Sequence, residues 1–241
     1  MQLTCSKTII TVIFDNYAYL PGFTPLWGFS AFIETDEYTI LFDTGSNGRV
    51  LLQNMARLDI DPADIDILFL SHPHWDHIGG IDSIIEANPH LDLVTPHSLS
   101  KHLINDLRKL CKTVTVVDKA PIRLLSCVWS TGTMSEVGEE SLVIDTEKGL
   151  VVVMGCAHPG IVSIAERAVE ILEKPIALLM GGFHLMERNR QEIADTLRAL
   201  DRLEIGYVSP SHCTGDLAIK MFHEHYEKRF IQGGIGQKIS I

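Results

Sequence analysis

Ser71-His72-Pro73-His74-Trp75-Asp76-His77 is the stretch of sequence that decides the fold of this chain, and Gly79-Gly80 follows it. Three imidazoles and one carboxylate fall within six positions. Histidine and aspartate are ligands that zinc and similar divalent ions bind, and so many polar groups are costly to bury without such a partner. The stretch therefore predicts a metal site rather than a histidine-rich surface loop.

The segment before this loop, Ile65–Leu70, is apolar and predicts a buried strand that carries the loop to one end of a sheet. The region 120–140 is mixed, and we expect a strand or two there, joined by loops. Elsewhere, apolar periodicity predicts strands at Thr8–Phe14, Trp27–Glu34, Tyr38–Phe42, Leu91–Val94, Thr113–Val117, Ser141–Asp145, Leu150–Met154, Ile176–Met180 and Gly206–Ser209, and helices over Val50–Leu58, Ile81–Ala87, Ser98–Leu110, Ile161–Leu172, Gln191–Leu203 and Thr214–Tyr226. The chain thus has two halves, each made mostly of strands with helices on the outside. This arrangement predicts an α/β fold of two sheets.

Composition bounds the class of protein. The 241 residues are 46% hydrophobic and 21% charged, which suits one large α/β core, so we expect a single domain over residues 1–241. The net charge of −11, with no run rich in lysine or arginine, argues against a nucleic-acid partner. No segment approaches the roughly 20 apolar residues of a membrane span, and no export signal is visible, so we expect no membrane partner.

The five cysteines are an odd number and lie far apart, without a Cys-x-x-Cys pair. This spacing predicts neither a disulfide framework nor a thiolate zinc finger, and it fits a cytoplasmic location. Cys156 and Cys213 lie beside later histidines, where a thiolate contact to metal is an alternative, but buried packing is the preferred interpretation. The sequence leaves the oligomeric state open.

Three later histidines, His158, His184 and His212, also come directly after apolar strands. Taken singly, each would be interpreted as an ordinary hydrogen-bonding histidine. The ends of neighbouring strands meet at one rim of a sheet, however, so side chains from several strand ends can share a site. A zinc ion takes about four ligands, so the set predicts two divalent ions, zinc first, with iron or manganese as alternatives. Two ions about 3.5–4 Å apart lower the pKa of water toward about 7 and supply a hydroxide. The six ligand candidates are His72, His74, Asp76, His77, His158 and His212.

These residues resemble the metallo-β-lactamase-fold superfamily, which is marked by His-x-His-x-Asp-His-x-Gly-Gly after a strand, an upstream Phe-Asp-Thr-Gly and later single histidines. The chain has Phe42-Asp43-Thr44-Gly45 upstream. The resemblance implies an αββα four-layer sandwich of two mixed sheets with helices on both outer faces. It also implies that Asp43 supports the metal loop from behind. By the same correspondence His72, His74 and His158 bind the first metal, and Asp76, His77 and His212 bind the second.

The chain departs from the family at one point. The family has an aspartate after a glycine on a later strand, bridging both metals, whereas Met180-Gly181-Gly182-Phe183-His184 has no carboxylate. Either His184 takes that place as a ligand, or it faces the substrate as a hydrogen-bond donor or proton carrier. Without that carboxylate, two dications, Asp76 and a hydroxide leave a charge of roughly +2, which favours a small anionic substrate. Asp76 and His184 are the expected catalytic residues.

The stretches 155–161, 181–185 and 211–215 resemble the branch named for 7,8-dihydropterin-6-methyl-4-(β-D-ribofuranosyl)aminobenzene-5'-phosphate synthase. This resemblance implies a metal-dependent hydrolase or transferase that acts on a phosphorylated, pterin-like molecule, through a metal-bound hydroxide or a metal-positioned substrate. The alternatives are a non-catalytic metal or ligand sensor on the same fold and a mononuclear iron oxygenase. Arg188 is a candidate phosphate contact, although an exposed helix start is preferred, and Trp75 is a candidate pocket wall with packing as its alternative.

Overall fold

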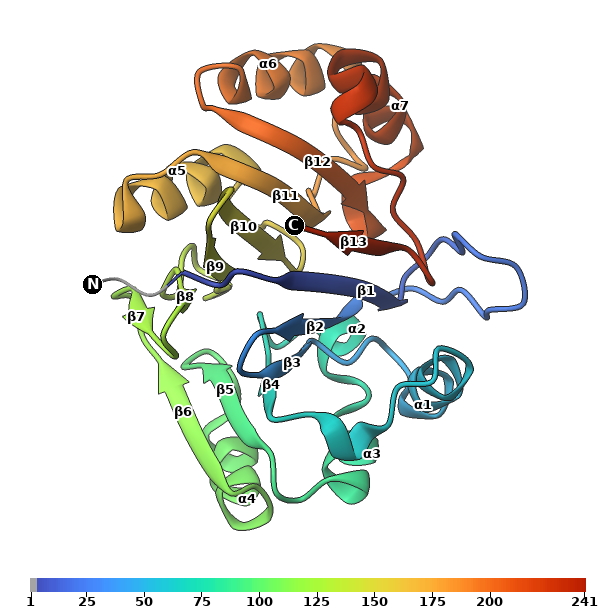
Figure 1. Cartoon of the computed structure of the whole chain (residues 1–241), viewed down its shortest axis with the longest axis vertical. Coiled ribbons are helices and arrows are strands. Elements are labelled where there is room, and N and C mark those ends of the chain that lie inside the picture. Colours follow the sequence, from blue (N-terminus) through green and yellow to red (C-terminus); the bar gives the residue numbers. More distant parts are fainter. Residues whose placement is uncertain (1–3) are drawn as a thin grey trace.

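The computed structural model describes residues 4–241. Two β-sheets pack face to face in the middle of the molecule, and helices cover the outer side of each sheet (Figure 1). Within the described residues one sheet has seven strands and the other six. The four-layer αββα sandwich expected from the sequence is confirmed.

The first sheet is mixed. Its strands lie in the order β13-β1-β2-β3-β4-β5-β6, with antiparallel pairing from β13 to β3 and parallel pairing from β3 to β6. Because β3 to β6 are parallel, their carboxyl ends lie at one edge. The strands are β1 (Thr8–Phe14), β2 (Ser30–Thr35), β3 (Thr39–Phe42), β4 (Ile67–Phe69), β5 (Asp92–Pro96), β6 (Thr113–Val117) and β13 (Lys238–Ser240), and the covering helices are α1 (Gly48–Arg57), α3 (Ile81–Ala87) and α4 (Lys101–Leu110).

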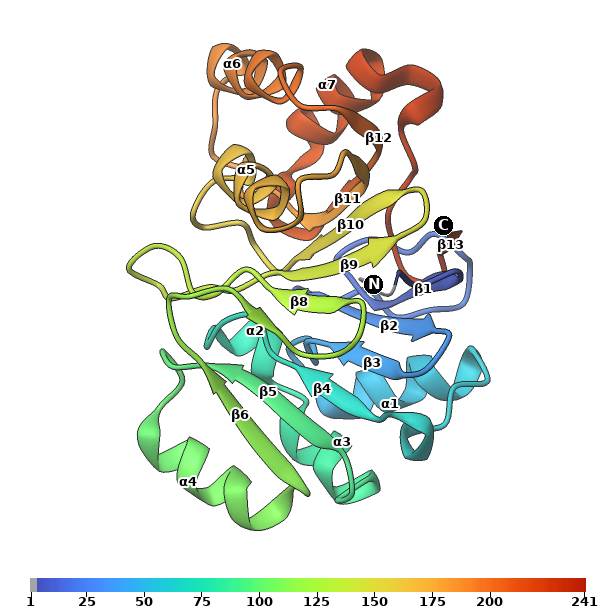
Figure 2. The ribbon, with the colours of Figure 1, turned by 60° about the vertical axis from the view of Figure 1, so that its left-hand side comes forward.

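The second sheet lies in the order β12-β11-β10-β9-β8-β7, and β10, β11 and β12 are parallel (Figure 2). Its antiparallel part is the β9–β10 hairpin with β8 and β7 beside it. The strands are β7 (Ile122–Arg123), β8 (Val128–Ser130), β9 (Leu142–Thr146), β10 (Gly149–Met154), β11 (Ile176–Gly182) and β12 (Ile205–Ser211), and the covering helices are α5 (Ile161–Leu172), α6 (Arg190–Leu200) and α7 (Asp216–Tyr226).

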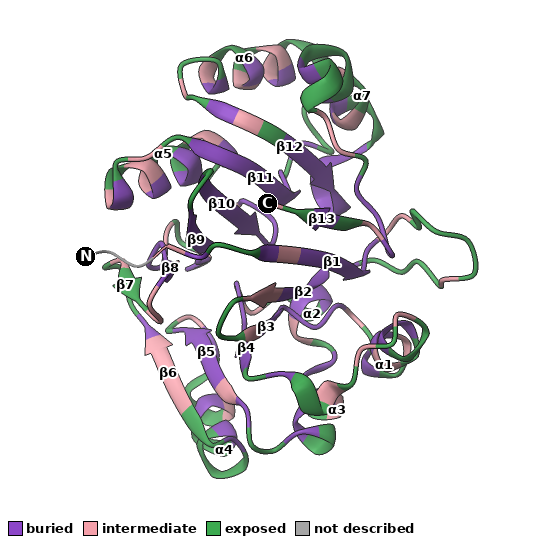
Figure 3. Cartoon of the chain, in the orientation of Figure 1, coloured by how far each residue is buried: buried purple, intermediate pink, exposed green. Residues whose placement is uncertain are grey.

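Strand alternation divides the core into three apolar layers. In β10, Val151 and Val153 point between the sheets, while Val152 and Met154 point toward the outer helices. The central strands are therefore buried on both faces, whereas the outer helix faces are exposed (Figure 3). Each fully buried side chain of this size stabilises the fold by about 1.5–3 kcal/mol. This core fixes the strand ends that carry the polar residues.

Most predicted elements are found within a few residues of their expected bounds. The strand expected at Trp27–Glu34 begins only at Ser30, because Gly28 turns the chain with φ +139. The helix expected to reach Leu203 ends at Leu200. Strand β13 and the short helix α2 (Trp75–Ile78) were not predicted. None of the helices in residues 4–241 has the length and apolar character needed to cross a membrane.

One expectation about the cysteines was wrong. Cys5 and Cys127 form a disulfide although 122 positions separate them in the chain. Both flank the same residue of β9, since the Cys5 N–H donates to the Asp145 carbonyl at 2.9 Å and the Asp145 N–H donates to the Cys127 carbonyl at 2.8 Å. The spacing of the cysteines along the sequence does not show that Cys5 and Cys127 both lie beside Asp145, so the disulfide could not be predicted from it. Cys111, Cys156 and Cys213 are buried free thiols.

Candidate metal centre

The predicted site residues meet at one rim of the molecule, where the carboxyl ends of strands from both sheets come together. Asp43 follows β3 and His72 follows β4 in the first sheet. His158 follows β10, His184 follows β11 and His212 follows β12 in the second sheet. The chain turns sharply at several of these strand ends, with left-handed backbone at Asp43 (φ 53), Ala157 (φ 58), His184 (φ 53) and His212 (φ 49). The sequence prediction of one shared rim is confirmed.

The helix α2 places Asp76 and His77 side by side on one turn. Two glycines let the chain after β3 pass directly against this helix. A Cβ atom on Gly79 would lie 2.6 Å from the Ser46 carbonyl oxygen, and one on Gly80 would lie 2.6 Å from the Thr44 carbonyl oxygen. The glycines of the motif are therefore required for close packing.

Asp43 holds the first part of the cluster from beneath. One of its oxygens accepts from the Ser71 N–H at 2.7 Å, and the other accepts from the Ser71 hydroxyl at 2.6 Å and from His77 Nδ1 at 2.7 Å. Because the Ser71 hydroxyl donates to Asp43, it accepts from His72 Nδ1 at 2.8 Å. The Nε2 atoms of His72 and His77 are therefore unprotonated acceptors in the neutral rings.

The later histidines are held in the same way. His158 Nδ1 donates to Glu139 Oε2 at 2.7 Å, and His212 Nδ1 donates to Asn16 Oδ1 at 3.0 Å. The Glu139 carboxylate is buried and also accepts from the His158 backbone N–H at 2.8 Å. Carboxylate or carbonyl partners on the far nitrogen are the usual outer support of a metal-binding histidine. Both rings thus turn Nε2 toward the rim.

The histidine nitrogens and the Asp76 oxygen that could bind a metal gather in two adjoining groups. In the first, His72 Nε2 lies 3.1 Å from His74 Nδ1, and the His158 ring centroid lies 4.8 Å from the His72 centroid and 4.7 Å from that of His74. In the second, Asp76 Oδ2 lies 3.7 Å from His77 Nε2 and 3.4 Å from His212 Nε2. Tetrahedral zinc with bonds of about 2.0–2.3 Å has ligand atoms about 3.3–3.8 Å apart. The spacing of the second group fits such an ion.

Burial keeps the central histidines in the form that binds metals. Desolvation, reinforced by neighbouring histidines, lowers the pKa of His72 to about 3 and that of His77 to about 3. Desolvation also lowers the pKa of His74. Burial alone would raise the pKa of Asp76, but its hydrogen bond with His212 and the nearby charge of His77 bring it below its usual value. Neutral imidazoles at His72, His74 and His77 beside the Asp76 carboxylate are a donor set that divalent cations satisfy.

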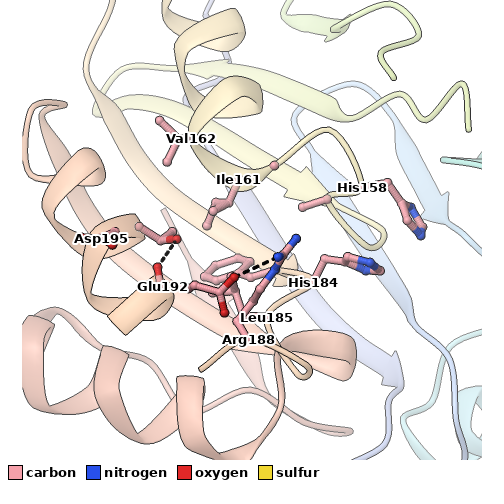
Figure 4. Close-up of a pocket in the computed structure, with 12 residues that line it drawn as sticks. His158, Ile161, Val162, His184, Leu185, Arg188, Glu192 and Asp195 are labelled. Carbon is pink, nitrogen blue, oxygen red and sulfur yellow. Dashed lines mark hydrogen bonds and ion pairs between the residues drawn. The ribbon is translucent and has the colours of Figure 1, made fainter. Parts of the chain in front are cut away.

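His184, Trp75 and Arg188 lie around the mouth of this centre. A cavity of about 440 Å³ is lined by Trp75, which is 63% exposed, by His184, and by four of the six ligand candidates, His74, Asp76, His158 and His212. A neighbouring cavity of about 330 Å³ runs from His158 and His184 toward α6 (Figure 4). Arg188 lines that cavity and pairs with Glu192 at 3.1 Å. The structure thus brings all the predicted site residues to one region.

Sequence reasoning missed several residues of this region. Glu139 lies in a mixed loop and carries no recognisable motif. Asp15 and Asn16 come directly after β1, so the strand-end signal that marked the histidines marks them too. Asp15 is fully buried, its pKa is raised to about 6 by burial, and it accepts from the His212 N–H at 3.4 Å. Trp27 was assigned to a strand, but its ring lies 5.2 Å from that of His212.

Comparison with known proteins agrees with this architecture. Residues 24–110 match the family model of the metallo-beta-lactamase superfamily. The chain is 31% identical to the 7,8-dihydropterin-6-methyl-4-(beta-D-ribofuranosyl)-aminobenzene-5'-phosphate synthase of Methanocaldococcus jannaschii, over 92% of each chain.

Two solved structures share the fold. Tm1679, a metal-dependent hydrolase of the beta-lactamase superfamily, superposes with a TM-score of 0.80 at 24% identity, over 97% of this chain and 99% of the other. The metallo-beta-lactamase fold protein YhfI from Bacillus subtilis gives a TM-score of 0.72 at 16% identity, over 98% of this chain and 100% of the other. The chain belongs to the metallo-β-lactamase superfamily, in the branch that contains the dihydropterin ribofuranosylaminobenzene phosphate synthase.

Proposed function

We propose that this protein is an enzyme with two divalent metal ions, zinc in the first instance. His72, His74 and His158 hold one ion, and Asp76, His77 and His212 hold the other. The observation that carries this proposal is the orientation of the histidines. Four of them have Nδ1 engaged by a hydrogen bond, which leaves Nε2 free, and the Nε2 atoms of His77 and His212 lie 3.7 and 3.4 Å from Asp76 Oδ2.

Two such ions would act as Lewis acids and would lower the pKa of a bound water to about 7. The residues of the chain supply the rest. Asp43 and Glu139 keep His77 and His158 in one tautomer and one orientation. Trp75 forms part of the cavity wall over the cluster. His184, whose ring centroid lies 4.5 Å from that of His158, faces the cavity, where it can donate a hydrogen bond or carry a proton.

We further propose that the substrate is a small anionic molecule with a phosphate and a pterin-like ring, acted on by hydrolysis or group transfer. The name of the Methanocaldococcus jannaschii relative supports this substrate class. The positive charge of two dications also favours an anion. Arg188 lines the cavity beside His184 and is a candidate phosphate contact, although Glu192 already pairs with it.

Turnover measurements test this proposal. The purified protein, reconstituted with zinc, manganese or iron, is assayed against phosphoester, lactone, thioester and reduced pterin substrates. We expect metal-dependent turnover of a phosphorylated substrate that is lost in His72→Ala and His212→Ala. The exposed His90→Ala variant, which makes the same change away from the site, should keep wild-type activity.

Two other results would overturn the enzyme proposal in different ways. Two bound metals without turnover on the whole panel would favour a sensor on the same fold. One iron per chain would favour a mononuclear iron oxygenase.

A further inference from the structure

Cys156 lies between the two groups of histidines. Its buried Sγ is 3.2 Å from His77 Nε2 and 3.3 Å from His212 Nε2, the free nitrogens of the second group. The same sulfur also forms a cluster with His72 and His158 of the first group, with all three ligating atoms within 4.8 Å of one another. One sulfur atom is therefore within reach of both proposed metal positions.

The turn after β10 fixes this sulfur in place. The N–H groups of Cys156 and Ala157 donate to Glu139 Oε1 at 3.0 and 2.8 Å. The other oxygen of Glu139 holds the ring of His158. Gly155 brings the turn against the metal loop, since a Cβ atom there would lie 2.2 Å from Ser71 Oγ. A single buried carboxylate thus positions Cys156 and a predicted ligand together.

The next strand has no room for the bridging carboxylate that the superfamily pattern expects. Gly182 follows Gly181 at the end of β11, where that aspartate would stand. A Cβ atom on Gly182 would lie 2.4 Å from the Gly155 carbonyl oxygen and 2.6 Å from Cys213 Sγ. The backbone and Cys213 therefore exclude a side chain at this position.

Resting on the two-metal centre proposed above, we propose that the thiolate of Cys156 is a ligand shared by both metal ions in place of the bridging carboxylate. The thiol gives up its proton to solvent as the metal–sulfur bonds form, because a coordinating thiol is deprotonated. The thiolate lowers the net charge of the centre from roughly +2 to roughly +1, the value that a bridging aspartate gives. The centre remains cationic toward an anionic substrate.

X-ray absorption at the zinc edge of the two-zinc protein tests the shared ligand directly. We expect a sulfur scatterer at about 2.3 Å, with about one sulfur per zinc. A sulfur bound to one ion alone would give about half a sulfur per zinc and would overturn the sharing. Two bound zinc ions with no sulfur scatterer would overturn any thiolate role and leave the two-metal proposal intact. A chain that binds no zinc would overturn both.

Variants identify the sulfur. The cobalt-substituted wild-type protein should show a sulfur-to-cobalt charge-transfer band. We expect this band to disappear in Cys156→Ser and to persist in Cys213→Ser and in Cys111→Ser, which alter the other two buried thiols. Loss of the band in Cys213→Ser but not in Cys156→Ser would overturn the assignment. Should Cys156→Ser fail to fold, Cys156→Asp replaces it. This variant should bind two cobalt ions without the band, and a persistent band there would contradict the proposal.

Discussion

Glu139 and His158 form a buried pair in which the carboxylate accepts from the imidazole Nδ1 at 2.7 Å and from the backbone N–H of the same histidine at 2.8 Å. Together with the N–H groups of Cys156 and Ala157, Glu139 organises the whole turn after β10. Burial alone would raise the pKa of Glu139, but the hydrogen bond and charge of His158 and the charge of His72 hold it below its usual range. The carboxylate therefore stays ionised, and able to accept these hydrogen bonds, to lower pH than an ordinary glutamate.

Replacing Glu139 with glutamine should weaken metal binding. In glutamine an NH₂ group takes the place of Glu139 Oε2. This group cannot accept from the ring and backbone N–H groups of His158, so the ring of His158 loses its support. Loss of such an outer partner lowers metal affinity about 10–100-fold. Competition with a chelator measures this affinity. Glu136→Gln makes the same change at an exposed position of the same loop and should leave affinity unaltered. Equal affinities for Glu139→Gln and the wild type would contradict the positioning role.

Asp43→Asn should reduce occupancy of the second metal position more than that of the first. Asparagine tolerates the left-handed backbone at this residue (φ 53), but its amide removes one acceptor that serves Ser71 and His77. We expect the free energy of unfolding of the metal-free chain to fall by about 1–3 kcal/mol. Metal analysis and chemical denaturation measure the two effects.

Asp59→Asn is the matched control for that change, because Asp59 is exposed and also has a positive φ of 56. It should alter neither metal content nor stability. If both variants behaved alike, the hydrogen bonds of Asp43 would have no special part in the site.

Gly182→Ala should destabilise the chain. The added Cβ would overlap the Gly155 carbonyl oxygen at 2.4 Å and Cys213 Sγ at 2.6 Å, and such overpacking costs about 1–3 kcal/mol. The double variant with Cys213→Ala should recover only part of the loss, since the carbonyl is backbone and cannot move aside. Thermal unfolding follows both, and a fully stable Gly182→Ala chain would show that a side chain fits at the end of β11.

Glu140 should make stability depend on pH. It is fully buried, its Oε2 accepts from Ser130 Oγ, and burial raises its pKa well above the usual 4.5. Below about pH 4.5 the carboxyl is protonated in both the folded and unfolded chain. As pH rises above that value only the unfolded chain ionises, so the free energy of unfolding falls by up to about 1.4 kcal/mol per pH unit.

Glu140→Gln removes this dependence, because the amide does not ionise. Relative to the wild type, the variant should therefore gain stability as the pH rises above about 4.5. Chemical denaturation with a chelator present measures the difference, and the exposed Glu147→Gln is the control. A difference that did not change with pH would contradict a protonated Glu140 in the folded chain.

Much of the fold and of the site follows from local patterns. The elements β1, β6, α3 and α5 have the predicted bounds. Their apolar residues repeat at the strand or helix period, and the faces that carry these residues pack in the interior of the sandwich. His72 was predicted from the dense His-x-His-x-Asp-His stretch, and His158 and His212 were predicted for a related reason. Each directly follows an apolar strand, and parallel strand ends meet at one rim.

The residues that were missed depend on contacts between distant segments. Glu139 becomes important only because the loop before β9 folds under the turn after β10, and nothing in its neighbourhood along the chain shows this. The same applies to Cys5 and Cys127, which meet across one residue of β9. Strand β13 is short and has a single buried residue, Ile239, so it has no detectable period.

Anomalous scattering at the zinc edge, from crystals of the protein grown with zinc, tests the central claim most directly. We predict two peaks in each molecule, one among His72, His74 and His158 and one among Asp76, His77 and His212, with nitrogen or oxygen ligands at about 2.0–2.2 Å. A single peak, or two peaks away from these six side chains, would contradict the two-metal centre.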